Sequence, residues 1–170
     1  MSARSFSGVA WPRLRHAICT GVFCLAALAP FLQFTAAHAA QSAARGADRV
    51  IVIRNDRGGL VAKRAEQIRQ IRRSGQRVEI RGTLCLSSCT MYLGLPGTCV
   101  SPNTTFGFHG PSRSGRRLSP DEFEYWSALI ARHYPAALRD WYMETGRMRI
   151  TSYYRMSGRE LIRLGVPACT

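Results

Sequence analysis

Acidic residues and lysine are scarce in this sequence. Asp and Glu together number 10 against 24 Lys and Arg, which gives a formal net charge of +14. Lys63 is the only lysine, so nearly all of the positive charge belongs to arginine. A basic surface can bind nucleic acid or acidic polymers, but the arginines are scattered and no nucleic-acid-binding motif accompanies them. We therefore expect a generic arginine-rich surface and no specific nucleic-acid partner.

Long apolar runs are also absent, except near the N-terminus. There, three arginines precede an apolar stretch over residues 17–34, and small residues follow it. This order is typical of a secretory signal peptide, and the motif AHA at 37–39 predicts cleavage after its final alanine, with Ala40 as the next choice. An uncleaved run of this length would be a membrane anchor, but Pro30 interrupts it. We therefore predict export to the periplasm or the cell exterior.

Processing at this site divides the chain into three parts. We predict a signal peptide over residues 1–39, a flexible leader over 40–48 and a folded domain over 49–170. The leader is small and polar, with little apolar surface to bury. The rest, roughly 120 residues, is large enough for one domain with a single hydrophobic core.

Four cysteines belong to the predicted domain, namely Cys85, Cys89, Cys99 and Cys169. An even number in an exported protein favours disulfides, and four cysteines allow three pairings, which the sequence leaves open. Zinc is the rival for Cys85 and Cys89. Their spacing lacks a matching second pair, and an oxidising compartment disfavours thiolate ligands, so we expect no metal.

Apolar periodicity and turn signals predict alternating strands and helices. Runs rich in β-branched and aromatic residues predict strands over 49–54, 77–81, 98–101 and 105–109. Helical spacing and capping signals predict helices over 60–73, 119–134, 135–144 and 160–164. GTLCLSSC at 82–89 is predicted as a turn that leads into a short helix reaching Leu93. This alternation predicts an α/β domain with parallel strands, in which chemistry lies at the carboxyl ends of strands.

Two kinds of reactive side chain lie at those strand ends. Ser87 and Ser88 follow the second predicted strand, and His109 ends the fourth. A serine hydroxyl becomes a nucleophile when a base lies within hydrogen-bond reach and donors stabilise the carbonyl oxyanion. The N–H after the serine and the glycine loop that ends in Gly59 can supply those donors. Such serines and glycines usually only cap helices or make turns, but their combination in this order predicts a hydrolytic site.

In that order the motifs resemble the ClpP-type serine peptidases of the ClpP/crotonase superfamily. NDRGG at 55–59 is similar to the family's NSPGG loop, and CLSSC at 85–89 to the segment that carries the nucleophile. PN at 102–103 and TFGFH at 105–109 resemble the family's stretch that ends in the base, and MSGRELIRLG at 156–165 resembles its closing segment. The resemblance, closest to small exported bacterial ClpP-like proteins, implies a ClpP/crotonase-like single domain with mostly parallel strands and flanking helices.

The resemblance also implies a role for each candidate residue. Ser87 would be the nucleophile, His109 the base, and the N–H groups of Gly59 and Ser88 the oxyanion hole. The number of residues between the glycine pair and the family's nucleophile fits Ser88 about as well as Ser87. The implied substrate is a peptide or protein, and no cofactor is implied. No ATP-driven unfoldase is expected for an exported protein, whereas a homo-oligomer is compatible with a fold that often assembles.

Two departures from the family pattern bear on activity. The family's acidic third residue comes just before the closing segment, where this chain has ITSYYR at 150–155 without a carboxylate. Asp140 or Glu144 would have to substitute from elsewhere. A Ser–Lys dyad is not expected either, because Lys63 follows the glycine loop instead of lying beyond the serine. Two hypotheses stay open: a Ser–His hydrolase, and a non-catalytic relative that binds a peptide or protein in the same groove.

Overall fold

The computed structural model describes residues 49–170, so the predicted signal peptide and leader lie outside the described residues. The elements follow one another as β1 (Val50–Asp56), α2 (Val61–Ser74), β2 (Arg77–Leu86), η1 (Ser87–Gly94), β3 (Cys99–Val100), β4 (Thr105–Phe108), α3 (Pro120–Ala131), α4 (Ala136–Glu144), η2 (Gly146–Met148), β5 (Tyr154–Ser157) and α5 (Gly158–Arg163). The two η elements are 3-10 helices. This order confirms the prediction of a mixed α/β domain.

The strands form one sheet in the order β1-β2-β4-β5, and the short β3 pairs with β2 away from this path. β2 runs parallel to β1, β3 and β4, while β5 pairs antiparallel with β4. The sheet is therefore mostly parallel, as predicted. Because β1, β2 and β4 point the same way, their carboxyl ends meet at one edge of the sheet.

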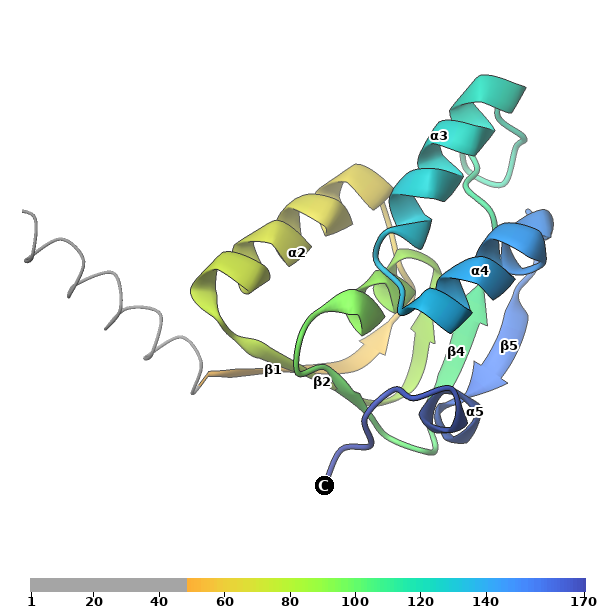
Figure 1. The fold of residues 1–170 in the computed structure, drawn as a ribbon. Helices are drawn as coiled ribbons and strands as arrows, with labels where there is room; N and C mark the ends of the chain where they lie inside the picture. The colour runs from red at the N-terminus through yellow and green to blue at the C-terminus, as the bar shows by residue number, and fades with distance from the viewer. Residues whose placement is uncertain (1–48) are drawn as a thin grey trace, which may run out of the picture. The chain divides into compact units, whose positions relative to one another are not determined.

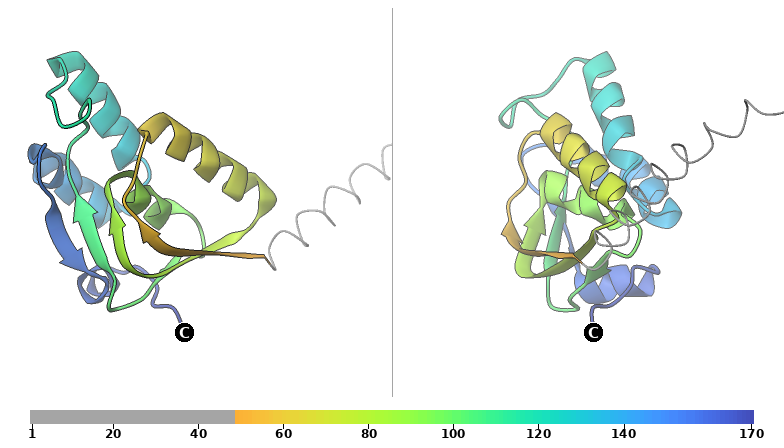
Figure 2. Two further views of the ribbon diagram at one scale, coloured as in Figure 1. Left: turned by 180° about the vertical axis from the view of Figure 1, so that it is seen from behind. Right: turned by 90° about the vertical axis from the view of Figure 1, so that its left-hand side faces the viewer.

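The helices of residues 49–170 gather on one face of this sheet (Figures 1 and 2). α2, η1 and α4 cover that face, and α3 extends beyond the edge where the parallel strands end. The core between the two layers is apolar and fully buried, with Ile80 and Phe106 from the sheet against Ile68, Leu138 and Tyr142 from the helices. The opposite face of the sheet carries exposed Val50 and Val52 from the edge strand β1.

Helix boundaries follow from local capping chemistry. α2 ends at Gly75, whose φ of 70° is the left-handed conformation that glycine adopts without a steric cost. α3 begins at Ser119, whose side chain accepts from the Glu122 amide while the Glu122 carboxylate accepts in return. The same capping box starts α5, from Ser157 to Glu160. The predicted restart of the helix at Pro135 is confirmed, because α3 and α4 are separate helices.

The segment 82–86 was predicted as a turn, and this prediction is wrong. β2 continues through it to Leu86, so Ser87 follows directly on a ten-residue strand. Gly82 resembles a turn signal, but it lies inside β2, where the backbone of β1 approaches it closely. A Cβ on Gly82 would lie 0.8 Å from the Arg54 carbonyl oxygen of β1. β5 was not predicted at all, since four residues paired only at an edge leave a weak pattern.

Two disulfides fix the pairing that the sequence left open. Cys85 bonds Cys89 across the junction of β2 and η1, and Cys99 bonds Cys169, which ties the C-terminal tail to β3. The zinc alternative for Cys85 and Cys89 is therefore wrong, because neither sulfur is a free thiolate. Two disulfides are typical of a protein from an oxidising compartment.

Within residues 49–170, no helix is both long enough and apolar enough to cross a membrane.

Candidate active site

The carboxyl ends of three neighbouring parallel strands bring the candidate residues together. β1 leads into the glycine loop, β2 into Ser87, and β4 into His109. Leu86, the last residue of β2, pairs in parallel with Gly107, the residue before the end of β4. The serine and the histidine therefore start from adjacent positions on adjacent strands.

Ser87 occupies a strained turn between a strand and a helix. Its φ of 55° is left-handed, which is uncommon for any residue except glycine and costs roughly 1–2 kcal/mol. Thr90 Oγ1 donates to the Ser87 carbonyl at 2.7 Å, and the same hydroxyl contacts Tyr134 Oη at 2.6 Å. A serine on a sharp strand-to-helix turn projects its hydroxyl away from the sheet, as nucleophiles of hydrolases do.

The Ser87 hydroxyl contacts a ring nitrogen of His109. The distance from Ser87 Oγ to His109 Nε2 is 2.8 Å. With the ring proton on Nδ1, Nε2 accepts the serine proton, which is the arrangement a general base needs. Tyr142 Oη donates to the His109 carbonyl at 3.2 Å, and the Tyr153 ring meets the imidazole edge-to-face at 5.1 Å. These two tyrosines hold the backbone and the ring of His109.

Among the described residues, no carboxylate bonds His109. Its Nδ1 is buried without a hydrogen-bond partner among residues 49–170. Burial is the main cause that lowers the pKa of His109 below the ordinary value. Asp140 instead pairs with Arg139 at 2.9 Å, and both Asp140 and Glu144 are exposed. The structure therefore assigns neither of these acids to the histidine.

The glycine loop lies directly against the serine. A Cβ on Gly58 would come within 2.5 Å of Ser87 Cβ, and its φ of 93° also requires glycine. The Gly58 amide donates to Asp56 Oδ1 at 2.7 Å. Within residues 49–170 no acceptor bonds the Gly59 amide, and the Ser88 amide is one of the first N–H groups of η1, which lack intrahelical partners. The amides of Gly59 and Ser88 are therefore free to donate, one from the residue after Gly58 and the other from the residue after Ser87.

Ser88 is placed differently from Ser87. Its side chain is 3% exposed, and its Oγ is buried without a partner in the described part of the chain. The residue that contacts His109 is Ser87, so the structure brings the preferred candidate, and not the alternative, together with the base. Lys63 is exposed on α2.

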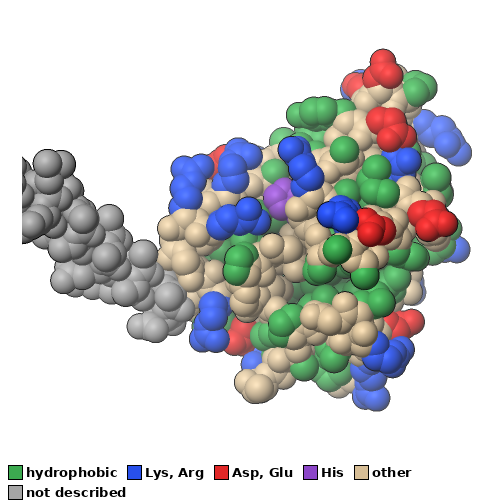
Figure 3. Space-filling model, in the orientation of Figure 1, with side chains coloured by type: hydrophobic (Ala, Val, Ile, Leu, Met, Phe, Trp, Pro, Cys, Tyr) green, Lys and Arg blue, Asp and Glu red, His purple; other side chains and the backbone are tan. Residues whose placement is uncertain are grey.

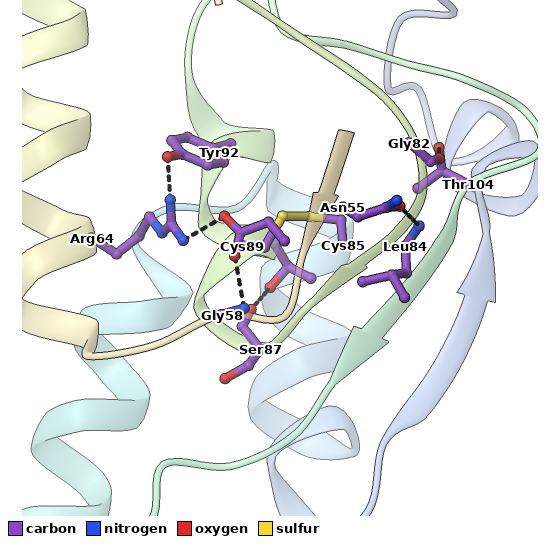
Figure 4. Close-up of a disulfide and its surroundings, with 12 residues drawn as sticks. Asn55, Gly58, Arg64, Gly82, Leu84, Cys85, Ser87, Cys89, Tyr92 and Thr104 are labelled. Carbon is purple, nitrogen blue, oxygen red and sulfur yellow. Dashed lines mark hydrogen bonds and ion pairs between the residues drawn. A yellow bond between two sulfur atoms is a disulfide. The ribbon is translucent and has the colours of Figure 1, made fainter. Parts of the chain in front are cut away.

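The Cys85–Cys89 disulfide brackets the serine (Figure 4). Both cysteines are fully buried, one at the end of β2 and one in η1. The bond therefore fixes the chain on both sides of Ser87. Glu79, Cys99 and Cys169 form the one cluster of potential metal ligands in residues 49–170, but the other disulfide occupies both of its sulfurs.

A cavity of about 410 Å³ lies between the segment that follows the glycine loop and the segment that follows His109, although neither Ser87 nor His109 lines it. Gly59, Leu60 and Val61 line one side of it, and Pro111, Leu118 and Trp126 belong to the rest of its mainly apolar wall. The first group continues the glycine loop, and Pro111 lies two residues beyond His109. The volume falls in the range of small-ligand sites, roughly 300–1,000 Å³.

Sequence reasoning missed the side chains that support the dyad. Asp56 was part of the NDRGG motif but was given no role, and Tyr153 was noted only within a segment without acid. Arg64, which pairs with Asp56, and Tyr92, which accepts a hydrogen bond from Arg64, carry no motif and come from other elements. In comparisons with known proteins, neither a family model nor a curated protein matches the chain.

Proposed function

We propose that the chain is an exported serine hydrolase, peptidase-like in its chemistry, that uses Ser87 and His109 with a backbone oxyanion hole. One observation carries this proposal: Ser87 Oγ lies 2.8 Å from His109 Nε2 on a strained strand-to-helix turn. A left-handed serine whose hydroxyl contacts a partly buried histidine is the arrangement expected of a nucleophile and its base. The family resemblance of the four motifs supports the same conclusion and suggests membership of the ClpP/crotonase superfamily.

The proposed reaction follows from the positions of these groups. Ser87 Oγ attacks the substrate carbonyl carbon while its proton passes to His109 Nε2. The oxyanion of the tetrahedral intermediate accepts hydrogen bonds from the amides of Gly59 and Ser88. When the intermediate collapses, His109 returns the proton to the leaving group and an acyl-serine remains. Water then attacks the ester, its proton passes through His109, and Ser87 is regenerated.

The missing acid makes this a slow enzyme by the standard of serine triads. An acid behind the histidine fixes the tautomer and stabilises the imidazolium, and its loss lowers turnover by about 10⁴-fold in a serine protease. Here Tyr142 and Tyr153 replace only its orienting role, because neither adds negative charge beside Nδ1. We therefore expect hydrolysis of activated or bound substrates at modest rates.

The cavity that Gly59 of the proposed oxyanion hole lines suggests where part of the substrate lies. Its wall of Leu60, Pro111 and Trp126 is suited to an apolar side chain next to the scissile carbonyl. A peptide or protein with such a residue is the proposed substrate. The two disulfides agree with action in the periplasm or outside the cell, where no ATP-driven unfoldase is expected.

A second candidate function is binding without catalysis in the same groove. The absence of a partner for His109 Nδ1 among residues 49–170 favours it, because loss of the acid strongly lowers the turnover of a serine triad. The partner would again be a peptide or protein. The two candidates differ in whether the Ser87 hydroxyl reacts.

A fluorophosphonate probe distinguishes them. The protein is purified in its oxidised form after export, beside Ser87→Ala, Ser88→Ala and His109→Ala. We expect the wild type and Ser88→Ala to be labelled, and Ser87→Ala and His109→Ala to lose labelling. Loss in Ser88→Ala alone would move the nucleophile by one residue. A folded wild type that takes no label would reject the hydrolase and favour the binding protein.

A further inference from the structure

Asp56, the last residue of β1, binds two different partners with its two carboxylate oxygens. Oδ1 accepts the Gly58 amide at 2.7 Å, and Oδ2 pairs with Arg64 Nη2 of α2 at 2.5 Å. The Asp56 side chain is 20% exposed and that of Arg64 is 11% exposed, so the ion pair is largely withdrawn from water. The carboxylate therefore joins the glycine loop to the first turns of α2.

Arg64 extends this link to η1. Another nitrogen of its guanidinium donates to Tyr92 Oη, and the guanidinium lies over the Tyr92 ring, 4.5 Å from the centroid. Tyr92 is fully buried and belongs to the same 3-10 helix that Ser87 begins. Figure 4 shows the resulting chain from Gly58 through the carboxylate to Arg64 and Tyr92. It connects the loop, α2 and η1.

Two side chains hold the glycine loop. Asn55 Oδ1 at its start accepts hydrogen bonds from Thr83 and Leu84 of β2. Among residues 49–170, Asp56 is the one side chain that bonds a glycine of the loop. Gly58 and Gly59 have φ values of 93° and 151°, in a region that glycine enters readily and that leaves the loop free to change conformation. Gly58 also touches Ser87, so a shift of the loop would displace the serine or open a gap beside it. The bond to Asp56 occupies the Gly58 amide and leaves the Gly59 amide as the free donor.

Stability alone does not account for this ion pair. Withdrawing two charges from water is unfavourable, and apolar side chains of similar size in their place often give a protein of equal or higher stability. Arg64 Nε is in addition buried without a partner among residues 49–170. An apolar cluster would stabilise the fold as well as this ion pair does. A role in fixing the conformation of the glycine loop explains why charged side chains are found here.

We infer that Asp56 is a positioning residue: through Gly58 and the Arg64–Tyr92 pair, it fixes the glycine loop against Ser87 so that the oxyanion donors meet the reacting carbonyl. The inference rests on the proposed hydrolase function and adds a requirement to it. Asp56 would touch no substrate, so its loss should slow the chemical step and leave substrate binding nearly unchanged.

The test compares two substitutions of Asp56 with a matched control. Asp56→Asn keeps the size and one acceptor but removes the charge that binds Arg64, and Asp56→Ala removes both bonds. The control is Glu66→Gln on α2, the helix that carries Arg64, which breaks an exposed ion pair with Arg69. The readouts are the fluorophosphonate labelling rate, kcat and KM for p-nitrophenyl butyrate, and Tm.

We expect the labelling rate and kcat to fall by about 10-fold in Asp56→Asn and about 100-fold in Asp56→Ala, because small misplacements of catalytic groups cost about that much. KM should change less than threefold, and Glu66→Gln should match the wild type. Should Asp56→Ala fail to fold, Tyr92→Phe supplies a milder test, since it removes one hydroxyl and keeps the ring under Arg64. It should slow labelling and leave KM unchanged.

The outcomes separate the two proposals. A labelled wild type with folded Asp56 variants that react at the wild-type rate would overturn the positioning role and leave the hydrolase intact. A fall in rate that Glu66→Gln shares would also overturn it, since the effect would then be general. A wild type that takes no label removes the hydrolase, and the positioning role with it.

Discussion

At the scale of single residues, His109 is the proposed base, and no carboxylate among residues 49–170 bonds it. Its Nε2 meets Ser87 Oγ, while Nδ1 finds no partner among the described residues. In a triad, the acid would favour the protonated imidazole and raise its pKa. Here burial is the main influence, and it disfavours the charged form. The histidine is therefore neutral, and able to accept a proton, at lower pH than an ordinary histidine.

The lowered pKa of His109 determines how the rate of the proposed reaction should change with pH. Protonated His109 cannot accept the serine proton, so the labelling rate should rise with pH and level off once the imidazole is neutral. Because the pKa of His109 is lowered from 6.5, the midpoint should lie below that value and the rate should be constant around pH 7. Rates of fluorophosphonate labelling between pH 4 and 8 measure it.

An NMR titration of the two described histidines serves as the control for that profile. Burial also lowers the pKa of His133, so His133→Gln is needed to assign the resonances. This substitution should leave the pH–rate profile unchanged. A midpoint at or above 6.5 would contradict the expectation and would indicate a carboxylate near His109 in solution.

At the scale of elements, the two disulfides differ in the length of chain that they close and in their distance along the chain from Ser87. Cys85–Cys89 closes a short segment, with a sequence separation of 4, across the junction that carries Ser87. Cys99–Cys169 spans a separation of 70 and anchors the tail. By chain entropy the long bridge stabilises the fold by about 4 kcal/mol and the short one by about 2 kcal/mol. The short bridge, however, is the one beside the reacting serine.

We therefore expect the long bridge to contribute more to the free energy of unfolding, and the short bridge to contribute more to the reactivity of Ser87. Cys99→Ala/Cys169→Ala should lose more free energy of unfolding in urea, while the surviving folded protein reacts with the probe at nearly the wild-type rate. Cys85→Ala/Cys89→Ala should lose less stability but label at least about tenfold more slowly, since Ser87 is freed to leave its left-handed conformation. Equal labelling rates in the two double variants would show that the short bridge does not position the serine.

Elements that carry their own boundary chemistry could be predicted from the sequence. α2 and α3 were predicted to within three residues at each end, because Gly75, Pro120 and the Ser119–Glu122 box mark those ends. β2 was cut short because Gly82 also resembles a turn signal, and only the neighbouring strand shows that it serves a close approach. β5 depends on pairing with β4, which no local pattern records.

In the candidate site, too, residues within local motifs could be predicted from the sequence, whereas contacts between distant segments could not. Ser87, His109 and the glycine pair each sit in a local motif, so the sequence was enough to propose them. The choice between Ser87 and Ser88 was not, because a one-residue difference depends on which of them turns left-handed at the end of β2. The bonds from Asp56 to Gly58 and Arg64 could not be foreseen either, since Arg64 approaches from a helix whose pattern predicts only an exposed basic face.

At the scale of the whole molecule, positive charge is in large excess. The chain has 24 Lys and Arg against 10 Asp and Glu. Figure 3 shows basic side chains gathered over α2, whereas several acidic ones lie around α3. Exposed arginines such as Arg72, Arg73 and Arg132 have no ion-pair partner among residues 49–170. Such an excess repels itself and destabilises the compact state.

Screening should therefore stabilise the folded protein. Raising NaCl from 10 mM to 300 mM shortens the range of the repulsion from about 30 Å to less than 10 Å, and we expect Tm to rise by about 2–5 °C. Sodium sulfate at equal ionic strength should act similarly over most of this range, and Ser87 should label at the same rate throughout. Differential scanning fluorimetry across both salts measures this. A stabilisation that saturates at low millimolar sulfate, and that NaCl does not reproduce, would instead reveal a specific anion site and make the arginine-rich surface a binding surface in its own right.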